Sequence, residues 1–159
     1  MRPSRRVFVP KVFLDSNGLI SAVITTKERP PIYRLVMLGE QEVIDLRISR
    51  EVISDVERFV QSRNAAMLPK VAEIIDKGRM AITPEPSEET ITRCEALTGY
   101  RPDARILAAA IECDADVLVT FDAAHLLGNP KIKPPEASVM VMNAQECLEW
   151  CFAQWQGGH

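Results

Sequence analysis

Residues 103–122, DARILAAAIECDADVLVTFD, carry the pattern that decides the fold class. The stretch opens with Asp103, continues as an apolar, alanine-rich segment of helical length, and turns at residues 114–116. The β-rich run 117–121 follows and ends on a second acid, Asp122. This pattern predicts a helix followed by a buried strand whose carboxyl end carries a carboxylate.

A second apolar run near the start of the chain ends in the same way. Residues 12–14, VFL, stop at Asp15 and give way to Ser-Asn-Gly. In open α/β sheets, ligands bind beyond the carboxyl ends of the strands, where the strand order reverses. We therefore expect the acids at the ends of these two strands to share one pocket. Carboxylates brought together repel one another, and hard divalent metal ions usually resolve that repulsion.

The rest of the chain alternates between strand-like and helix-like patterns. Further strands are predicted at 43–48, 80–83 and 138–142, the first of them an outer strand because apolar and polar residues alternate in it. Helices are predicted at 18–24, at 32–38 with Gly39 as the stop, from Ser49 to about residue 60, at 69–77, at 87–97, as a short turn at 124–127, and from Asn143 through 155. Strands that alternate with helices predict an α/β fold, a three-layer α/β/α sandwich around a central parallel sheet.

Composition narrows the class of protein. The 159 residues, 47% hydrophobic and 26% charged, fit one globular domain over residues 1–159, in which the basic residues 1–11 form a mobile tail. The net charge of −3 excludes a general attraction to nucleic acid, so such binding needs a local basic patch. No apolar run is long enough to span a bilayer, and the four cysteines form no C-x-x-C pair. Cys147 and Cys151 are expected to be buried, reduced thiols, and the location cytoplasmic.

Polar residues near the two strand ends are candidates for the same pocket. Thr120 lies two residues before Asp122, and its hydroxyl is expected to hold a water molecule at the metal. Asn17 can hydrogen-bond Asp15 or a substrate oxygen, although Asp and Asn are also ordinary turn residues. Asp103 fits a helix N-cap equally well.

Asp55 lies beside Glu51 and Glu57 on the helix that Ser49 opens. Charges on an amphipathic helix usually form its solvated face, and the sequence alone does not choose among these three acids.

Four segments together resemble the PIN (PilT N-terminus) domain family: VFLDSN near the start, SREVISD in the second quarter, DARILAAA, and then LVTFD. The chain is similar in particular to short single-domain PIN proteins, which include VapC-like toxins of toxin–antitoxin pairs. The resemblance covers nearly the whole chain. It implies a sheet of flavodoxin-like order, Mg²⁺ or Mn²⁺ in an acidic pocket, and hydrolysis of RNA.

The resemblance also implies roles for individual residues. Asp15, Asp103 and Asp122 match the family's metal-binding acids, and Asn17 and Thr120 match its supporting polar residues. Asp55 matches the second family acid, a position that is usually Glu, so Glu51 or Glu57 remains an alternative there.

The expected function is therefore that of a metal-dependent endoribonuclease whose acids hold an ion that activates water for attack on a phosphodiester. His125 is expected to be a helix-end residue rather than a base. Loop cations are expected to contact RNA phosphates, namely Arg29, Arg101 and Lys131, with Arg34 and Lys133 as further candidates.

A toxin role would bring an antitoxin partner. A homodimer is also expected, and the apolar helix faces at 32–38 or 52–60 offer an interface for it, although packing in the core is the plainer explanation of these faces. Two other functions remain open. One is a non-catalytic PIN-like module that binds RNA or protein. The other is a phosphatase of the haloacid-dehalogenase type, which needs a second Asp where Asn17 stands.

Overall fold

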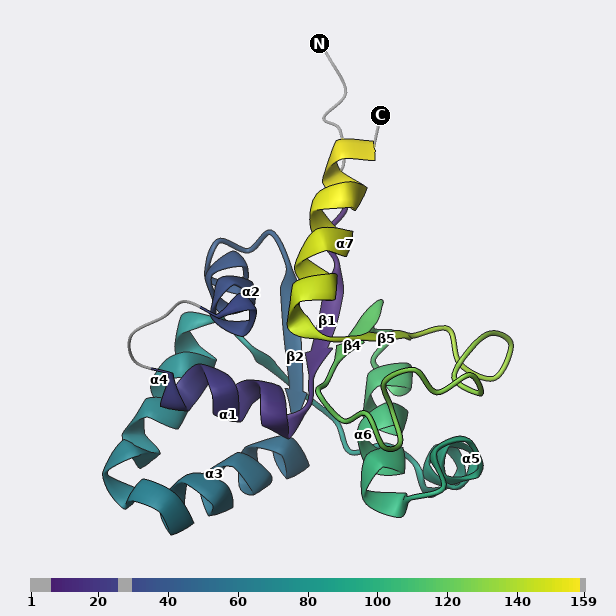
Figure 1. Ribbon diagram of the computed structural model, residues 1–159, viewed down its shortest axis with the longest axis horizontal. Coiled ribbons are helices and arrows are strands. Elements are labelled where there is room, and N and C mark those ends of the chain that lie inside the picture. Colours follow the sequence, from purple (N-terminus) through teal and green to yellow (C-terminus); the bar gives the residue numbers. More distant parts are fainter. Residues whose placement is uncertain (1–6, 26–29, 158–159) are drawn as a thin grey trace.

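A single parallel sheet forms the centre of the molecule (Figure 1). This computed structural model describes residues 7–25 and 30–157. The strands are β1 (Lys11–Leu14), β2 (Asp45–Ser49), β3 (Ala81–Thr83), β4 (Val117–Val119) and β5 (Met140–Met142). They lie in the order β3-β2-β1-β4-β5, and every neighbouring pair is parallel. The direction of winding reverses between β1 and β4, which is where such sheets open a crevice at their carboxyl ends.

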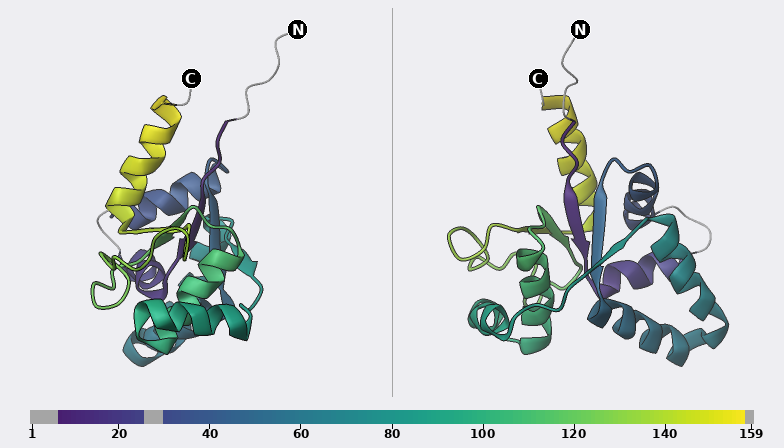
Figure 2. Two further views of the ribbon diagram at one scale, coloured as in Figure 1. Left: turned by 90° about the vertical axis from the view of Figure 1, so that its right-hand side faces the viewer. Right: turned by 180° about the vertical axis from the view of Figure 1, so that it is seen from behind.

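Within residues 7–25 and 30–157, eight helical segments connect and cover the strands. They are α1 (Ser16–Ile24), α2 (Pro31–Glu40), α3 (Arg50–Asn64), the 3₁₀ turn η1 (Ala65–Met67), α4 (Leu68–Lys77), α5 (Glu88–Thr98), α6 (Arg101–Glu112) and α7 (Ala144–Gly157). Helices α5 and α6 pack together beside β4 and β5, whereas α1, α3 and α4 gather beside β2 and β3 (Figures 1 and 2). The prediction of a three-layer α/β/α sandwich with a parallel sheet is confirmed.

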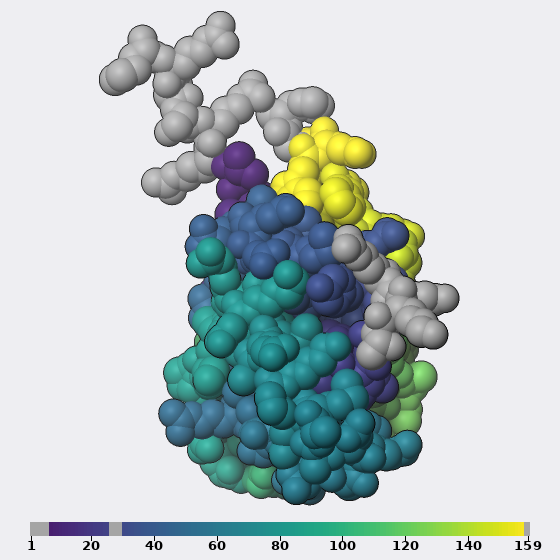
Figure 3. Space-filling view, turned by 90° about the vertical axis from the view of Figure 1, so that its left-hand side faces the viewer, coloured from purple at the N-terminus to yellow at the C-terminus, as the bar shows by residue number. Residues whose placement is uncertain are grey.

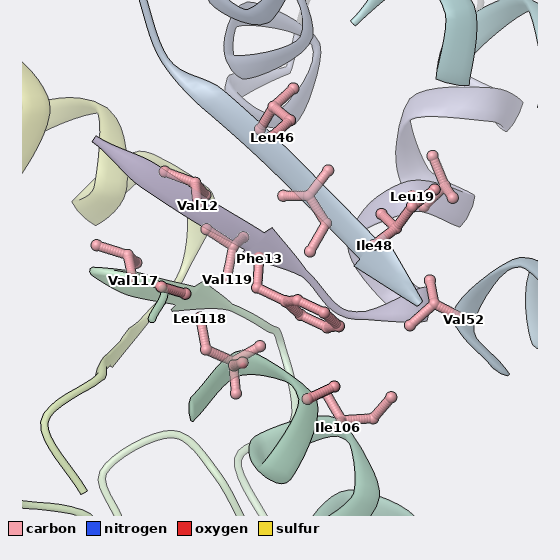
Figure 4. Close-up of a cluster of buried hydrophobic side chains, with 14 of the residues drawn as sticks. Val12, Phe13, Leu19, Leu46, Ile48, Val52, Ile106, Val117, Leu118 and Val119 are labelled. Atoms are coloured by element: carbon pink, nitrogen blue, oxygen red, sulfur yellow. The ribbon is translucent and has the colours of Figure 1, made fainter. Parts of the chain in front are cut away.

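The core lies on both faces of the sheet, as Figure 4 shows. Phe13 of β1 and Leu118 of β4 are paired in register and point toward Ile106 of α6. Successive residues of a strand point to opposite faces, so Ile48 of β2 points the other way, toward Leu19 of α1. All five side chains are at most 4% exposed. Burial on both faces explains why the central strands are almost continuous apolar runs.

Two expectations about the sheet are wrong. The order is 3-2-1-4-5 rather than the flavodoxin-like 2-1-3-4-5, because the first three strands wind continuously to one side of β1. The strand predicted at 43–48 lies inside the sheet, between β1 and β3, and not at an outer edge. Its polar positions are accommodated because Asp45 and Arg47 pair with each other at 2.8 Å. The predicted edge position of β3 is confirmed.

Most helix boundaries follow from local chemistry in the sequence. Ser49 caps α3 by accepting a hydrogen bond from the amide of Val52 at 3.2 Å. Asn143 and Glu146 form the predicted capping box of α7, with bonds of 3.0 and 2.8 Å. Gly99 ends α5 in the left-handed conformation at φ +71°, which glycine adopts without steric cost. The predicted helical turn at 124–127 consists of hydrogen-bonded turns instead.

Gly39 does not stop its helix, since α2 continues through it to Glu40. A Cβ atom at Gly39 would lie 2.5 Å from the carbonyl oxygen of Gly78 and 2.7 Å from Cδ1 of Leu46. The glycine is therefore required because α2 approaches the end of α4 so closely.

The apolar faces of α2 and α3 pack in the core, which confirms the plainer of the two explanations for them. Ile32, Leu35 and Val36 of α2, and Val52 and Val56 of α3, are at most 1% exposed. These faces are therefore not available to a second copy, and the homodimer itself stays a prediction. Cys147 and Cys151 are buried and free, as expected.

Only part of the predicted amino-terminal tail is described. Residues 1–6 lie outside the described residues, and Lys11 already belongs to β1. Nε1 of Trp155 donates to the carbonyl oxygen of Phe8 at 3.0 Å, and the rings of Phe8 and Trp150 meet edge to face at 5.9 Å. In Figure 3 the first described residues lie beside α7. Among the described helices, none is long and apolar enough to cross a membrane.

Candidate metal centre

The pairing of β1 with β4 brings the two strand-end acids together. The amide of Asp15 donates to the carbonyl oxygen of Val119 at 3.0 Å, so the residue after β1 lies beside the end of β4. Oγ1 of Thr120 donates to Oδ2 of Asp15 at 2.8 Å and accepts from the amide of Asp122 at 3.0 Å. One hydroxyl thus connects the two segments that carry Asp15 and Asp122.

Thr120 and Asn17, the two supporting polar residues, both bond to the segments that carry the acids. The side chain of Thr120 is fully buried, and its hydroxyl bonds to Asp15 and to the amide of Asp122. It therefore positions the acids, and its contact with a metal-bound water stays a prediction. Asn17 acts similarly, because its Oδ1 accepts a hydrogen bond from the amide of Phe121 at 3.2 Å. Both side chains hold the loop after β4 against the start of α1.

Asp103 is not the cap of its helix. Helix α6 begins at Arg101, Tyr100 occupies the N-cap position, and Asp103 lies in the first turn. Because α6 turns back tightly into β4, its first turn lies beside the carboxyl end of that strand. The side chain of Asp103 is 16% exposed. Within the described part of the chain, its Oδ2 is a buried oxygen that has no hydrogen-bond partner.

His125 completes a group of three possible metal ligands. Its Nδ1 lies 2.8 Å from Oδ2 of Asp103 and 3.6 Å from Oδ2 of Asp122. One nitrogen or oxygen atom from each of the three residues lies within 4.8 Å of the others. The expectation that His125 is a helix-end residue is wrong. The sequence signal for its position was its spacing of three residues from Asp122. Asp122 caps this turn, since its Oδ1 accepts a hydrogen bond from the amide of Ala124 at 2.8 Å.

Burial has the largest effect on the pKa values of these three acids. Burial, followed by the neighbouring carboxylates of Asp122 and Asp15, raises the pKa of Asp103 from 3.8 to about 7. Burial also raises the pKa of Asp15, against the lowering effect of its hydrogen bond from Thr120. For Asp122, burial alone would raise the pKa, but hydrogen bonds to Asp103 and to the amides of Ala124 and His125 outweigh it and lower the pKa.

Comparison with models of known protein families shows which family this chain belongs to. A family model described as the PIN domain matches residues 11–124. The chain belongs to the PIN domain family. This match sets aside the alternative of a haloacid-dehalogenase-type phosphatase. No curated protein matches the chain.

Solved structures agree with the PIN assignment at the level of the fold. The chain is similar to PAE2754 from Pyrobaculum aerophilum, with 14% sequence identity and a TM-score of 0.63, over 94% of this chain and 100% of that one. It is also similar to a chain in the crystal structure of VapBC2 from Rickettsia felis, in which VapBC2 is bound to a DNA fragment from its promoter. There the identity is 19% and the TM-score 0.57, over 84% of this chain and 98% of the other.

The second acid expected of a PIN domain lies apart from the three-residue ligand group. Asp55 lines a groove of about 700 Å³ between α3 and α6, where it pairs with Arg58 at 3.3 Å. Glu51 lines the same groove and pairs with Arg105 at 3.5 Å. Glu57 is exposed. The ligand group Asp103, Asp122 and His125 contains none of these three acids, and Asp15 also lies outside it, bonded to Ser16 and Thr120.

The cations expected to contact RNA differ in their availability. Arg101 of the PIN domain is held between two carboxylates, those of Glu88 and Glu95, the latter at 2.9 Å. Its charge is thus already compensated. Lys131 is exposed on the loop after β4, and Arg29 lies outside the described residues.

Proposed function

We propose that this PIN domain is a divalent-metal-dependent ribonuclease whose ion is held by Asp15, Asp103 and Asp122. The observation that carries the proposal is the buried Oδ2 of Asp103, which has no hydrogen-bond partner among the described residues and faces Asp122 and His125. A buried acceptor without a donor is costly unless a cation completes it. Carboxylate oxygens are the ligands that Mg²⁺ and Mn²⁺ prefer, so the donor set fits such an ion.

A bound divalent ion would neutralise the carboxylates and act as a Lewis acid toward a phosphodiester. The chain's own residues prepare the pocket for it. Thr120 and the amide of Ser16 fix the two oxygens of Asp15 at 2.8 and 2.7 Å, so that carboxylate is already oriented. The carboxyl of Asp103, with its pKa raised to about 7, can hold a proton near neutral pH and release it when a cation arrives.

Asp55 has an assisting role in this proposal. Because it pairs with Arg58 in the groove between α3 and α6 and lies outside the three-residue ligand group, we place it on the path of the RNA strand rather than on the ion. Lys131, exposed on the loop after β4, is proposed to meet a phosphate of the same strand.

A toxin–antitoxin role is the second part of the proposal. It is supported by the family and by the likeness in fold to VapBC2, and it would supply an antitoxin protein as partner. The rival function is a non-catalytic PIN domain that binds RNA or protein without an ion.

The test is a calorimetric Mn²⁺ titration with the wild type, Asp103→Asn and Asp55→Asn, followed by cleavage of a mixed RNA substrate. We expect Asp103→Asn to abolish both ion binding and cleavage. Asp55→Asn is the matched control, because it also removes one carboxylate, and it should retain ion binding. A wild type that binds no Mn²⁺ would overturn the proposal in favour of the non-catalytic module.

A further inference from the structure

We propose that His125 is a nitrogen ligand of the divalent ion, beside Asp103 and Asp122, and that it shifts the preference of the site from Mg²⁺ toward transition metals. The inference rests on the proposed function in one respect, because it requires that the acids hold an ion. It goes beyond that function by adding a ligand and by naming the class of metal that the ligand selects.

The distances around Nδ1 of His125 are those of atoms that share one ion. Metal–ligand distances of about 2.1 Å put adjacent ligands of an octahedral ion about 3.0 Å apart and opposite ligands about 4.2 Å apart. Nδ1 lies 2.8 Å from Oδ2 of Asp103 and 3.6 Å from Oδ2 of Asp122. The first value is close to the spacing of adjacent ligands, and the second lies between the adjacent and the opposite spacing.

A hydrogen bond does not account for the shorter of these contacts. Within the described residues, Oδ2 of Asp103 is buried and accepts no hydrogen bond, although Nδ1 of His125 is only 2.8 Å away. The two atoms are therefore close without the alignment that a hydrogen bond needs. A cation between them would satisfy both lone pairs.

The imidazole ring is held in place by residues other than the acids. It stacks on the ring of Tyr100 with centroids 4.8 Å apart and an angle of 18°. The carbonyl oxygen of His125 accepts a hydrogen bond from Nδ2 of Asn129 at 2.8 Å, and the amide of His125 approaches Oδ1 of Asp122 at 3.4 Å. A ligand fixed in this way loses little freedom when an ion binds, so the site is preorganised.

Nitrogen in the ligand set changes which metals the site favours. Mg²⁺ prefers oxygen ligands, whereas imidazole suits metals later in the first transition row, and affinity generally rises from Mn²⁺ to Co²⁺ and beyond. A site that adds one imidazole to its carboxylates should thus bind Co²⁺ more tightly than Mg²⁺. Removal of the imidazole should weaken Co²⁺ binding much more than Mg²⁺ binding.

The experiment measures the ligand directly, by pulsed electron paramagnetic resonance of Mn²⁺ bound to protein without a histidine tag. Nitrogen modulation of the electron spin echo is expected in the wild type and should disappear in His125→Ala and in His125→Gln. The matched control is His159→Ala, which removes the other histidine of the sequence and should keep the modulation.

Calorimetric titrations of the same variants supply the second readout. We expect the dissociation constant for Co²⁺ to rise about tenfold or more in His125→Ala. Even the loss of a residue that only hydrogen-bonds a metal ligand lowers metal affinity about 10–100-fold. The dissociation constant for Mg²⁺ should change less than about twofold.

The outcomes separate this inference from the proposed function. Mn²⁺ that binds to the wild type without nitrogen modulation would overturn the role of His125 and leave the acidic ion site intact. A wild type that binds neither Mn²⁺ nor Co²⁺ would overturn both. If His125→Ala fails to fold, His125→Gln decides, because its side chain offers a coordinating oxygen in place of the ring nitrogen.

Discussion

Replacing Asp103 by Asn should stabilise the metal-free protein at alkaline pH while destroying its proposed ion site. The pKa of this carboxyl is raised from 3.8 to about 7 by burial and by the carboxylates of Asp122 and Asp15. At a pH between these two pKa values, the folded state therefore keeps a proton on Asp103 that the unfolded state has already lost. Stability is present at low pH and falls as pH rises through this window.

The size of the effect follows from the difference in pKa. About three pH units at about 1.4 kcal/mol each give an upper value of roughly 4 kcal/mol for ionising Asp103 in the folded state. Solvent reaches part of this side chain and screens its charge, so we expect about 1–2 kcal/mol. For a chain of this length that corresponds to a rise in Tm of about 2–8 °C.

The assay is urea and thermal denaturation with EDTA, comparing the wild type with Asp103→Asn at about pH 5 and about pH 8. The variant should be the more stable protein at the higher pH, and the difference should shrink at the lower one. Asp76→Asn, on the exposed face of α4, controls for the loss of one negative charge and should show no such trend. An Asp103→Asn variant that is less stable than the wild type at both pH values would refute the reasoning.

Two further predictions concern stability, and one concerns ion binding. Thr120→Val should lower the free energy of unfolding by about 1–3 kcal/mol, because Oδ2 of Asp15 loses its buried donor. Thr120→Ser keeps the hydroxyl and should retain most of that stability. Equal losses in the two variants would contradict the role of the hydroxyl. Gly39→Ala should lower the free energy of unfolding by about 1–3 kcal/mol, because its Cβ would clash with the carbonyl oxygen of Gly78. Gly157→Ala is the control and should be neutral, since a Cβ there meets nothing within 4 Å. Urea denaturation measures both variants, and a neutral Gly39→Ala would show that α2 can shift. Saturating Mn²⁺ should raise the Tm of the wild type but not of Asp103→Asn, and a rise in both would move the ion elsewhere.

The sequence determined the strands, most helix ends and the first acids of the pocket. The apolar runs 12–14 and 117–119, followed within three residues by Asp15 and Asp122, show where two buried strands stop, because strands buried on both faces are almost continuously apolar. The caps at Ser49 and Asn143 are local hydrogen bonds, so the local sequence suffices to predict them. The parallel sandwich then follows from the alternation of elements.

Only the tertiary structure decided which side chains meet. Asp103 was ambiguous because a helix N-terminus attracts acids for its own stability, and only the tight return of α6 into β4 shows that this acid faces Asp122. His125 joins the ligand group through an irregular turn, and no periodic pattern in the sequence predicts the direction of a side chain there. Gly39 depends on the approach of α2 to Gly78, a contact between residues far apart in sequence.

The same distinction explains the wrong expectations. The polar residues of β2 suggested an outer strand because a sequence shows polarity but not the partner that neutralises it, and Arg47 finds that partner in Asp45. Local physics thus determines the elements and their ends, whereas contacts between distant segments determine the site, because those contacts depend on how the whole chain packs.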